Sequence, residues 1–300
     1  MTTEIGPVAA RRADAVTPAY KPKGYWHTVA ERLSDDKATI VFLTIIILAI
    51  LSAVFAPIIA PHDPYATSMI ARLKPIGTES YLLGTDELGR DMLSRLLYGG
   101  RMSLAMGILP VLFAVGIGGL LGVLAGFAGG VTNTLIMRTM DVFYAFPSVL
   151  LAVAISGTMG GGAASGLLAL TLVFIPSLCR IAETATTQIR SLDFVEAARA
   201  TGASSLSIIS RHIIGNVLPP VFIYASSLVS VSILLAAGLS FLGLGVEPPT
   251  PDWGQMLSNL RQAIYIQPLV CALPGIAIFI VSLSFNLVSD GLRHAMDVKS

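Results

Sequence analysis

Long blocks without a charged residue alternate with polar segments along this chain of 300 residues. The first block, Ala38 to Ala60, would make a helix about 34 Å long, enough to cross a hydrocarbon core of about 30 Å. The other apolar blocks cover 102–137, 142–179, 221–245 and 270–289. Glycines at 129–130 end the helix within block 102–137. Glycines at 160–162 divide block 142–179 into two helices. The pattern therefore predicts an all-α integral membrane protein with six transmembrane helices.

The polar segments between the spans define the domain organisation that we expect. It consists of a leader at 1–37, a first span at 38–60, an outer segment at 61–101, a five-helix core at 102–290 and a tail at 291–300. Within the core, an inner loop covers 183–220 and an outer loop covers 246–268. With the N-terminus inside, the cytoplasmic segments hold 13 of the 19 Lys and Arg residues. This excess predicts that both termini are cytoplasmic.

Composition agrees with a membrane protein and excludes several other classes. Hydrophobic residues make up 54% of the chain and charged residues 12%, against about 25% charged residues in soluble domains. The net charge of +1, without a basic stripe, argues against nucleic acid as a partner. Membrane lipid is the expected surrounding of the apolar helices. Neither the cysteines nor the histidines have metal-ligand spacing. The middle of each span is free of charge, which disfavours the alternative of a stand-alone ion-coupled transporter or channel.

The inner loop contains a pattern of two short helices joined at an elbow. Asp193 can cap the first helix, with Glu196 three residues later as in a capping box. Gly202 suits the left-handed position after a helix end. Ser204 or Ser205 can begin a second helix, which we expect to stop before Pro219. An amphipathic connector with no further role is the alternative interpretation.

The outer segment carries charges at helical spacing. Thr85 can cap a helix that contains Gly89, and a glycine inside a helix suggests close packing. The charges four residues apart form two possible pairs, Asp86 with Arg90 and Asp91 with Arg95. Such pairs contribute only about 0.2 to 0.5 kcal/mol each. We therefore expect a solvated surface helix.

Glycine and proline positions bear on helix packing. A repeat of small residues every fourth position, which lets another helix approach closely, is formed by Gly118, Gly122 and Gly126. Pro147 and Pro176 fall within the third and fourth spans and should kink them.

Several charged and aromatic residues are interpreted as anchors at the membrane boundary. Arg138 and Asp141 lie at the inner end of the third span, where such a pair anchors a helix, and a switch element is the alternative. Trp253 and Tyr265 in the outer loop fit the aromatic belt of a membrane protein.

Three ordered sets of residues narrow the class. The inner loop contains Glu196, Ala197, Ala198, Gly202, Leu218 and Pro219. The outer segment contains Gly84, Thr85, Asp86, Gly89, Arg90, Asp91, Ser94 and Arg95. The outer loop contains Pro248, Pro249, Pro251, Trp253 and Gly254. Together they resemble the permease subunits of binding-protein-dependent ABC importers, and in particular the C-type subunits of dipeptide, oligopeptide and nickel importers. The resemblance covers roughly Ala38 to the C-terminus.

The resemblance implies a type I ABC importer permease fold in the bacterial inner membrane, with the inner loop as the coupling helix. The implied partners are a second, homologous permease subunit, two cytoplasmic ATPase subunits and an extracytoplasmic substrate-binding protein. The chain has no Gly-rich loop ending in Gly-Lys-Ser or Gly-Lys-Thr, so ATP would be bound by partner subunits. We expect no cofactor and no catalytic residue in this chain. Di- or oligopeptides are the cargo that the resemblance implies, with nickel, glutathione or another small solute as the alternative.

Overall fold

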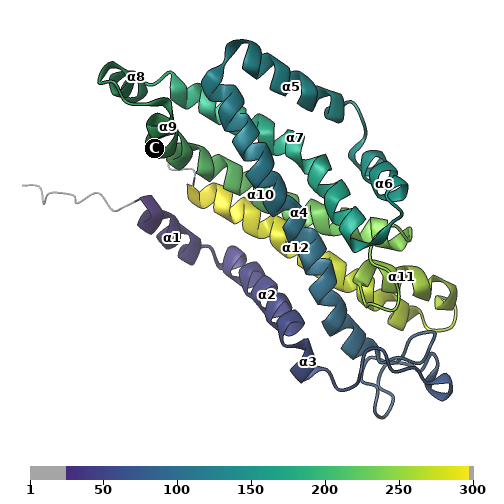
Figure 1. The fold of residues 1–300 in the computed structure, drawn as a ribbon. Helices are drawn as coiled ribbons and strands as arrows, with labels where there is room; N and C mark the ends of the chain where they lie inside the picture. Colours follow the sequence, from purple (N-terminus) through teal and green to yellow (C-terminus); the bar gives the residue numbers. More distant parts are fainter. Residues whose placement is uncertain (1–24, 297–300) are drawn as a thin grey trace, which may run out of the picture.

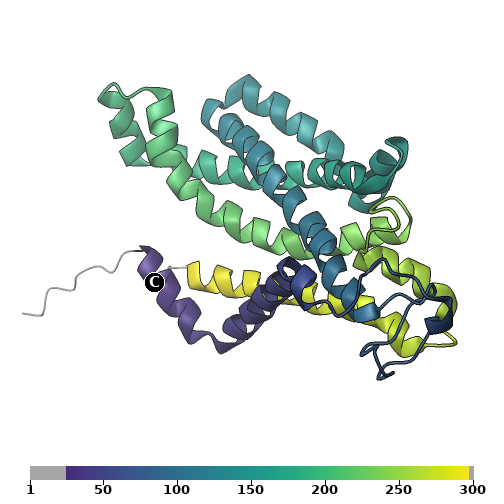
Figure 2. The same ribbon diagram turned by 60° about the horizontal axis from the view of Figure 1, so that its bottom comes forward.

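The computed structural model describes residues 25–296 as a bundle of helices (Figures 1 and 2). Residues 1–24 of the expected leader and 297–300 of the expected tail lie outside the described residues. Between residues 25 and 296 the structure has no strand, which confirms the all-α prediction. The α-helices are α1 (Tyr25–Asp35), α2 (Lys37–Val54), α3 (Ala56–Ile59), α4 (Met92–Ala128), α5 (Gly130–Tyr144), α6 (Ser148–Thr158), α7 (Gly162–Arg190), α8 (Asp193–Ala200), α9 (Ser205–Ile208), α10 (Ile214–Phe241), α11 (Trp253–Leu260) and α12 (Pro268–Met296). Short 3-10 helices cover Met69–Ala71 and Arg261–Ala263, and a π-helix covers Ile209–Ile213.

The predicted spans correspond to long apolar helices. Within the described residues, five helices are long and apolar enough to cross a membrane, namely α2, α4, α7, α9 continued into α10, and α12. A sixth crossing is formed by α5 and α6 if this pair, bent by 88°, counts as one span. The third span is therefore broken rather than kinked. Pro147 lies in the break as the N-cap residue of α6, because a proline disfavours the helical conformation of the residue before it.

Several helices extend beyond the charge-free blocks that predicted them. α4 begins at Met92 rather than Met102, and α7 continues through charged residues to Arg190. The prediction that the second helix of the elbow stops before Pro219 is wrong, because α10 runs through Pro219 and Pro220. Charged side chains can continue a helix beyond the hydrocarbon core. A membrane helix also tolerates proline where neighbouring groups satisfy the freed backbone atoms.

The glycine repeat lies where α4 packs against α7. A Cβ atom on Gly118 would lie 2.6 Å from the carbonyl oxygen of Ile175, and one on Gly126 would lie 2.7 Å from that of Glu183. Gly122 faces the backbone of α7 in the same way. Any side chain at these positions would push the helices apart, which confirms the predicted close approach.

The two ends of the bundle differ. At one end α8 and α9 project as an elbow, and α1 and the end of α12 lie on that same side (Figures 1 and 2). The other end carries the segment 61–91 and α11 (Figure 1). The described chain thus begins and ends on the side of the elbow.

Candidate functional site

The elbow begins with α8, whose first turn is closed by backbone groups. The predicted capping box is wrong, because α8 starts at Asp193 itself and its N-cap residue is Leu192, which makes no side-chain cap. The carbonyl oxygen of Leu192 accepts the N–H groups of Val195 at 2.9 Å and of Glu196 at 3.3 Å. Asp193 and Glu196 both lie in the first turn, where the helix dipole stabilises negative charge.

The turn between α8 and α9 follows the prediction. Gly202 has a φ of +83°, which glycine adopts without steric cost. Its N–H donates to the carbonyl oxygen of Arg199 at 3.0 Å, and that of Ala203 donates to Ala198 at 3.1 Å. These are the two hydrogen bonds of a Schellman motif. Ser204 then caps α9 with its hydroxyl, so the left-handed glycine and the serine cap are both confirmed.

Buried apolar side chains fix the elbow to the bundle. Val195 on α8, Ile208 on α9 and Ile213 in the π-helix are buried. The guanidinium carbon of Arg199 lies 5.4 Å from the ring centre of Phe127 near the end of α4, a cation–π distance. The elbow therefore packs on one side against the helices beneath it.

The outward face of the elbow is exposed. Leu192 and Phe194 are large exposed apolar residues, Glu196 and Ala197 are exposed, and Ala198 is half-buried. Small side chains beside apolar ones at the tip of a projecting helix suit a groove in a partner protein. We call the residues 192–194 and 196–198 the elbow face.

The last two residues of the inner-loop motif lie outside the elbow face. Leu218 and Pro219 are in the first turns of α10. Leu218 lines an apolar groove with residues of α4 such as Leu120, and Pro219 is half-buried. The motif therefore divides into a surface at the elbow and a helical segment within the bundle.

The outer segment is not the solvated surface helix that the charge spacing predicts. Residues 84–91 form turns, and α4 begins only at Met92. Asp91 is the N-cap residue, and its carboxylate accepts the amide N–H of Ser94 at 2.9 Å and its hydroxyl at 2.6 Å.

Turn geometry explains why no helix forms before Met92. Gly84 and Gly89 have φ values of +76° and +75°, which a right-handed helix does not contain. Thr85 does not cap a helix. Its hydroxyl donates to the carbonyl oxygen of Ala71 and accepts the N–H of Lys74, the latter at 2.8 Å, and so ties two parts of the segment together.

Two buried arginines meet at the carboxylate of Asp86. The Nε of Arg90 donates to Asp86 Oδ2 at 2.6 Å, and the Nε of Arg95 lies 3.3 Å from the same oxygen. Arg95 is only 1% exposed and also donates to the carbonyl oxygen of Pro64 at 3.1 Å. The predicted pair of Asp86 and Arg90 is confirmed. The predicted pair of Asp91 and Arg95 is wrong, because Arg95 turns to Asp86 instead.

Glu87 extends this cluster. Its Oε1 accepts a hydrogen bond from Arg90 at 3.0 Å, while Oε2 is buried and has no hydrogen-bond partner among the described residues. Burial raises the pKa of Glu87, and the neighbouring charge of Asp86 raises it further. We call Asp86, Glu87, Arg90 and Arg95 the outer charge cluster.

The outer loop is packed onto the same end of the bundle. Trp253 is not a membrane-boundary anchor, because it is 6% exposed and its Nε1 donates to the carbonyl oxygen of Leu96 at 2.9 Å. A Cβ atom on Gly100 would lie 3.1 Å from the Trp253 ring, so the absence of a side chain there lets the ring pack closely against α4. Tyr265 is fully exposed.

Asp252 connects the outer loop to α4. As the N-cap residue of α11 it accepts the N–H groups of Gly254 at 3.0 Å and Gln255 at 3.2 Å, and the hydroxyl of Ser103 on α4 at 2.6 Å. Burial raises the pKa of Asp252. Gly254 lies against the backbone of Ala237 on α10. Of the three prolines in this motif, the structure exposes Pro248 and Pro249, which share a cis peptide bond, and buries Pro251.

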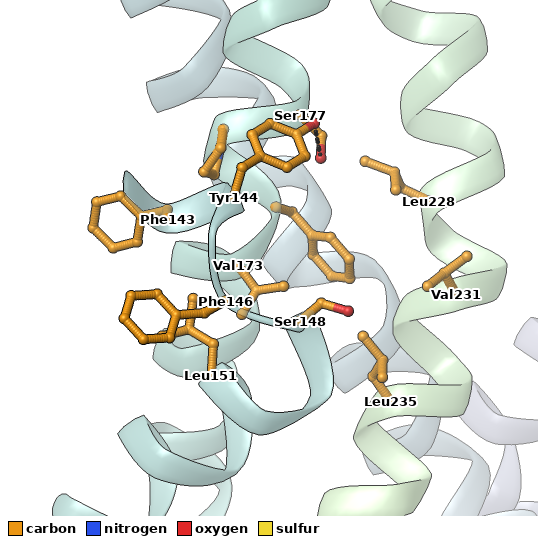
Figure 3. Close-up of a pocket in the computed structure, with 12 residues that line it drawn as sticks. Phe143, Tyr144, Phe146, Ser148, Leu151, Val173, Ser177, Leu228, Val231 and Leu235 are labelled. Atoms are coloured by element: carbon orange, nitrogen blue, oxygen red, sulfur yellow. Dashed lines mark hydrogen bonds between the residues drawn. The ribbon is translucent and has the colours of Figure 1, made fainter. Parts of the chain in front are cut away.

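A pocket halfway along the bundle is not evident from the sequence. It has a volume of about 280 Å³ and lies where the break between α5 and α6 faces α7 and α10 (Figure 3). The hydroxyl of Tyr144 donates to Ser177 at 2.9 Å. Val231 on α10 lines the pocket across from Ser148 (Figure 3). Pro176, which the sequence predicts to kink the fourth span, lines this pocket.

Comparisons with known proteins agree with the fold. Binding-protein-dependent transport system inner membrane components match over residues 118–299, and the N-terminal transmembrane domain of oligopeptide transport permease C matches residues 24–75. The probable D,D-dipeptide transport system permease protein DdpC of Escherichia coli K12 is 37% identical over 97% of both chains. The di/tripeptide permease protein DppC of Pseudomonas aeruginosa is 40% identical over 92% of both chains. The glutathione permease protein GsiD of Pectobacterium atrosepticum is 39% identical over 91% of both.

Among solved structures, the inward-facing MetNI methionine ABC transporter matches with a TM-score of 0.56. The match covers 68% of this chain and 97% of the other at 21% identity. At this identity it shows a similar fold and nothing more. The long apolar helices of the bundle define an all-α integral membrane protein. The chain belongs to the family of binding-protein-dependent transport system inner membrane components. It is a permease subunit of an ABC importer in the inner membrane, as the three motifs indicate.

Proposed function

We propose that this permease subunit forms half of the translocation path for short peptides and receives its energy through the elbow face. The observation that carries the coupling role is the surface at the tip of the elbow, where Glu196 and Ala197 are exposed and Ala198 is half-buried. It lies at the end of the bundle opposite the packed outer loop (Figure 1). In this proposal the elbow, and both termini with it, is on the cytoplasmic side.

Chain connectivity supports a mechanical role for the elbow. α7 ends at Arg190 and α8 begins at Asp193, so only two residues separate a membrane-spanning helix from the elbow. On the other side, α9 runs through the π-helix into α10 without a break. A push on the elbow face would therefore move α7 and α10 together and rock this half of the bundle.

The proposal includes partners that this chain lacks. Two cytoplasmic ATPase subunits would bind and hydrolyse ATP, a second permease subunit would complete the path, and an extracytoplasmic binding protein would deliver the cargo. The chain itself would hold no cofactor and perform no catalysis, because its contribution is a moving path rather than a reactive group.

Short peptides are the proposed cargo. The relatives are named for D,D-dipeptides, for di- and tripeptides and for glutathione. What these cargoes share is a short peptide backbone, and a path for such cargo needs no ion site at its centre.

Two substitutions test the coupling role in the assembled complex. Glu196→Lys reverses the charge of the elbow face, and Gly202→Leu forces a side chain onto a φ of +83°. We expect each to lower recovery of the ATPase subunits on purification by about tenfold, which corresponds to about 1.4 kcal/mol of binding free energy. ATP-driven uptake of labelled di- and tripeptides into proteoliposomes should fall with it.

Matched variants serve as controls. Glu247→Lys makes the same charge reversal at an exposed position between α10 and α11, and should retain the ATPase subunits. Gly202→Asn should restore most of the docking, because asparagine tolerates the left-handed conformation. Normal recovery and uptake with Glu196→Lys and Gly202→Leu would contradict the coupling role. Absence of ATP-driven peptide uptake by the unmodified complex would contradict the cargo.

A further inference from the structure

The pocket of Figure 3 lies near the middle of two long helices. Ser177 is halfway along α7, and Leu228 is halfway along α10. Its volume of about 280 Å³ is at the lower end of the range of about 300 to 1,000 Å³ for small-molecule sites. The pocket is thus large enough for one side chain of a cargo molecule, and too small for a whole oligopeptide.

Polar groups at this depth indicate a watery path. Tyr144 and Ser148 at the break are exposed, and the Ser148 hydroxyl points across the pocket toward α10 (Figure 3). Hydrocarbon provides no hydrogen-bond partner for such groups or for the backbone of a broken helix. An interrupted span with exposed hydroxyls at mid-length is therefore expected to face a water-filled cavity and not lipid.

An ion pair lies at the rim of the pocket. A terminal nitrogen of Arg180 donates to Asp141 at 2.6 Å, and the guanidinium carbon lies 4.9 Å from the ring centre of Tyr144. The contact between Arg138 and Asp141, predicted as an anchor, is longer at 3.5 Å. Arg180 and Asp141 are 48% and 42% exposed. Half-exposed charges within membrane-spanning helices mark a substrate path more often than a lipid-facing surface.

We infer that the pocket and Arg180 form a binding site for the C-terminal residue of a peptide in transit, an inference that rests on the proposed function. The apolar wall of Phe174, Leu228, Val231 and Leu235 receives an apolar side chain. The planar guanidinium of Arg180, with five donors, binds the terminal carboxylate as a fork. Asp141 acts as a positioning residue, because its bond holds the guanidinium above Tyr144 at the pocket rim.

A photo-crosslinking amino acid identifies what occupies the pocket. We place benzoylphenylalanine at Val231 in the complete complex with its second permease, ATPases and binding protein, during turnover with Ala-Phe. The matched control is Leu234, which is on the same helix and exposed but does not line the pocket. Labelled Ala-Phe attached at Val231 and absent at Leu234 supports the inference. Attachment of the partner permease or of lipid at Val231 overturns it.

Selectivity of uptake gives a second measurement. In Arg180→Gln, uptake of Ala-Phe should fall about tenfold relative to Ala-Phe amide, which lacks the carboxylate. In Val231→Phe, uptake of Ala-Phe should fall about tenfold relative to Ala-Gly, whereas Leu234→Phe should leave this ratio unchanged. Because the binding protein is the same throughout, a changed ratio arises in the permease. A purely structural role would lower uptake of all peptides equally and would overturn the inference.

These results separate the two proposals. If the unmodified complex imports no peptide, the proposed function fails whatever the crosslinks show. If it imports peptides by ATP hydrolysis but the ratios and the crosslinks do not change as expected, only the pocket site fails.

Discussion

The elbow and the outer charge cluster lie at opposite ends of the bundle and share local structural features, but they differ in burial. Each contains a left-handed glycine, Gly202 in the elbow and Gly89 in the outer segment, and each precedes a capped helix. The elbow leaves its acidic residue Glu196 exposed, whereas the outer cluster buries Arg95 beside Asp86. The first arrangement leaves a surface free for a partner. The second fixes the end of α4 with charges that are buried rather than offered to a partner.

The difference in burial determines what each region can contribute. A buried charge is costly to leave without its partner, so the outer cluster holds one conformation. Exposed charges at the elbow are screened by water and contribute little to stability. We therefore expect the outer cluster to determine whether the permease folds, and the elbow to determine whether it couples.

The largest predicted effect on stability is that of Asp86→Ala. It leaves Arg90 and Arg95 buried without their shared carboxylate, and we expect a loss of about 3 to 5 kcal/mol in the free energy of unfolding. Thermal or denaturant unfolding of the purified protein in detergent micelles measures it. The fraction of the Asp86→Ala protein that still folds and assembles should keep the coupling between ATP hydrolysis and uptake.

A substitution of an exposed aspartate in the same segment is the control for this loss of unfolding free energy. Asp63 is exposed, and its carboxylate accepts one N–H bond from Tyr65 at 2.8 Å. Asp63→Ala should cost about 1 kcal/mol. Equal losses for the two variants would mean that the outer charge cluster is no more important for the fold than a surface turn.

A smaller effect is expected from the protonation of Glu87. Burial raises the pKa of this side chain in the folded protein, so the folded state holds the proton more tightly than the unfolded state does. Stability contributed by the neutral form is complete below the ordinary pKa and is lost as pH rises through the raised value. Glu87→Gln keeps an oxygen to accept from Arg90 and removes this loss.

We therefore expect Glu87→Gln to unfold at a higher temperature than the unmodified protein at neutral pH and to lose that advantage in acid. Glu79→Gln, at an exposed position in the same segment, is the matched control. A Glu87→Gln variant with the same pH profile as the unmodified protein would mean that Glu87 is ionised without penalty in the fold.

The sequence predicts the spans better than their ends. Charge-free blocks locate the helices because lipid excludes charge. They cannot locate the ends, since a helix continues past the hydrocarbon for as long as its backbone bonds continue, as α7 does to Arg190. The break at Pro147 is visible as a proline, but the 88° bend depends on what α6 packs against.

The candidate sites show a similar limit. Gly202 and Ser204 were predictable because their roles follow from the local backbone. The spacing of Asp86 and Arg90 fits a helix, but a turn around Gly89 brings the same side chains together. The seat of Trp253 on α4 and the pocket at Ser148 arise from contacts between helices distant in the sequence, which spacing alone does not encode.

The smallest predicted effect on stability is that of Ala197→Leu on the elbow face. The residue is exposed, and alanine and leucine are both good helix formers, so the free energy of unfolding should change by less than about 0.5 kcal/mol. The larger side chain should nonetheless block docking of the ATPase subunits, measured as the ATPase rate stimulated by loaded binding protein.

Val195→Ala on the same helix is the opposite test, because Val195 is fully buried. It should lower the free energy of unfolding by about 1.5 kcal/mol and leave the elbow face unchanged. If Ala197→Leu destabilised the protein as much as Val195→Ala, the elbow face would be part of the packed core, and the contrast between a fixed outer end and a free inner surface would not hold.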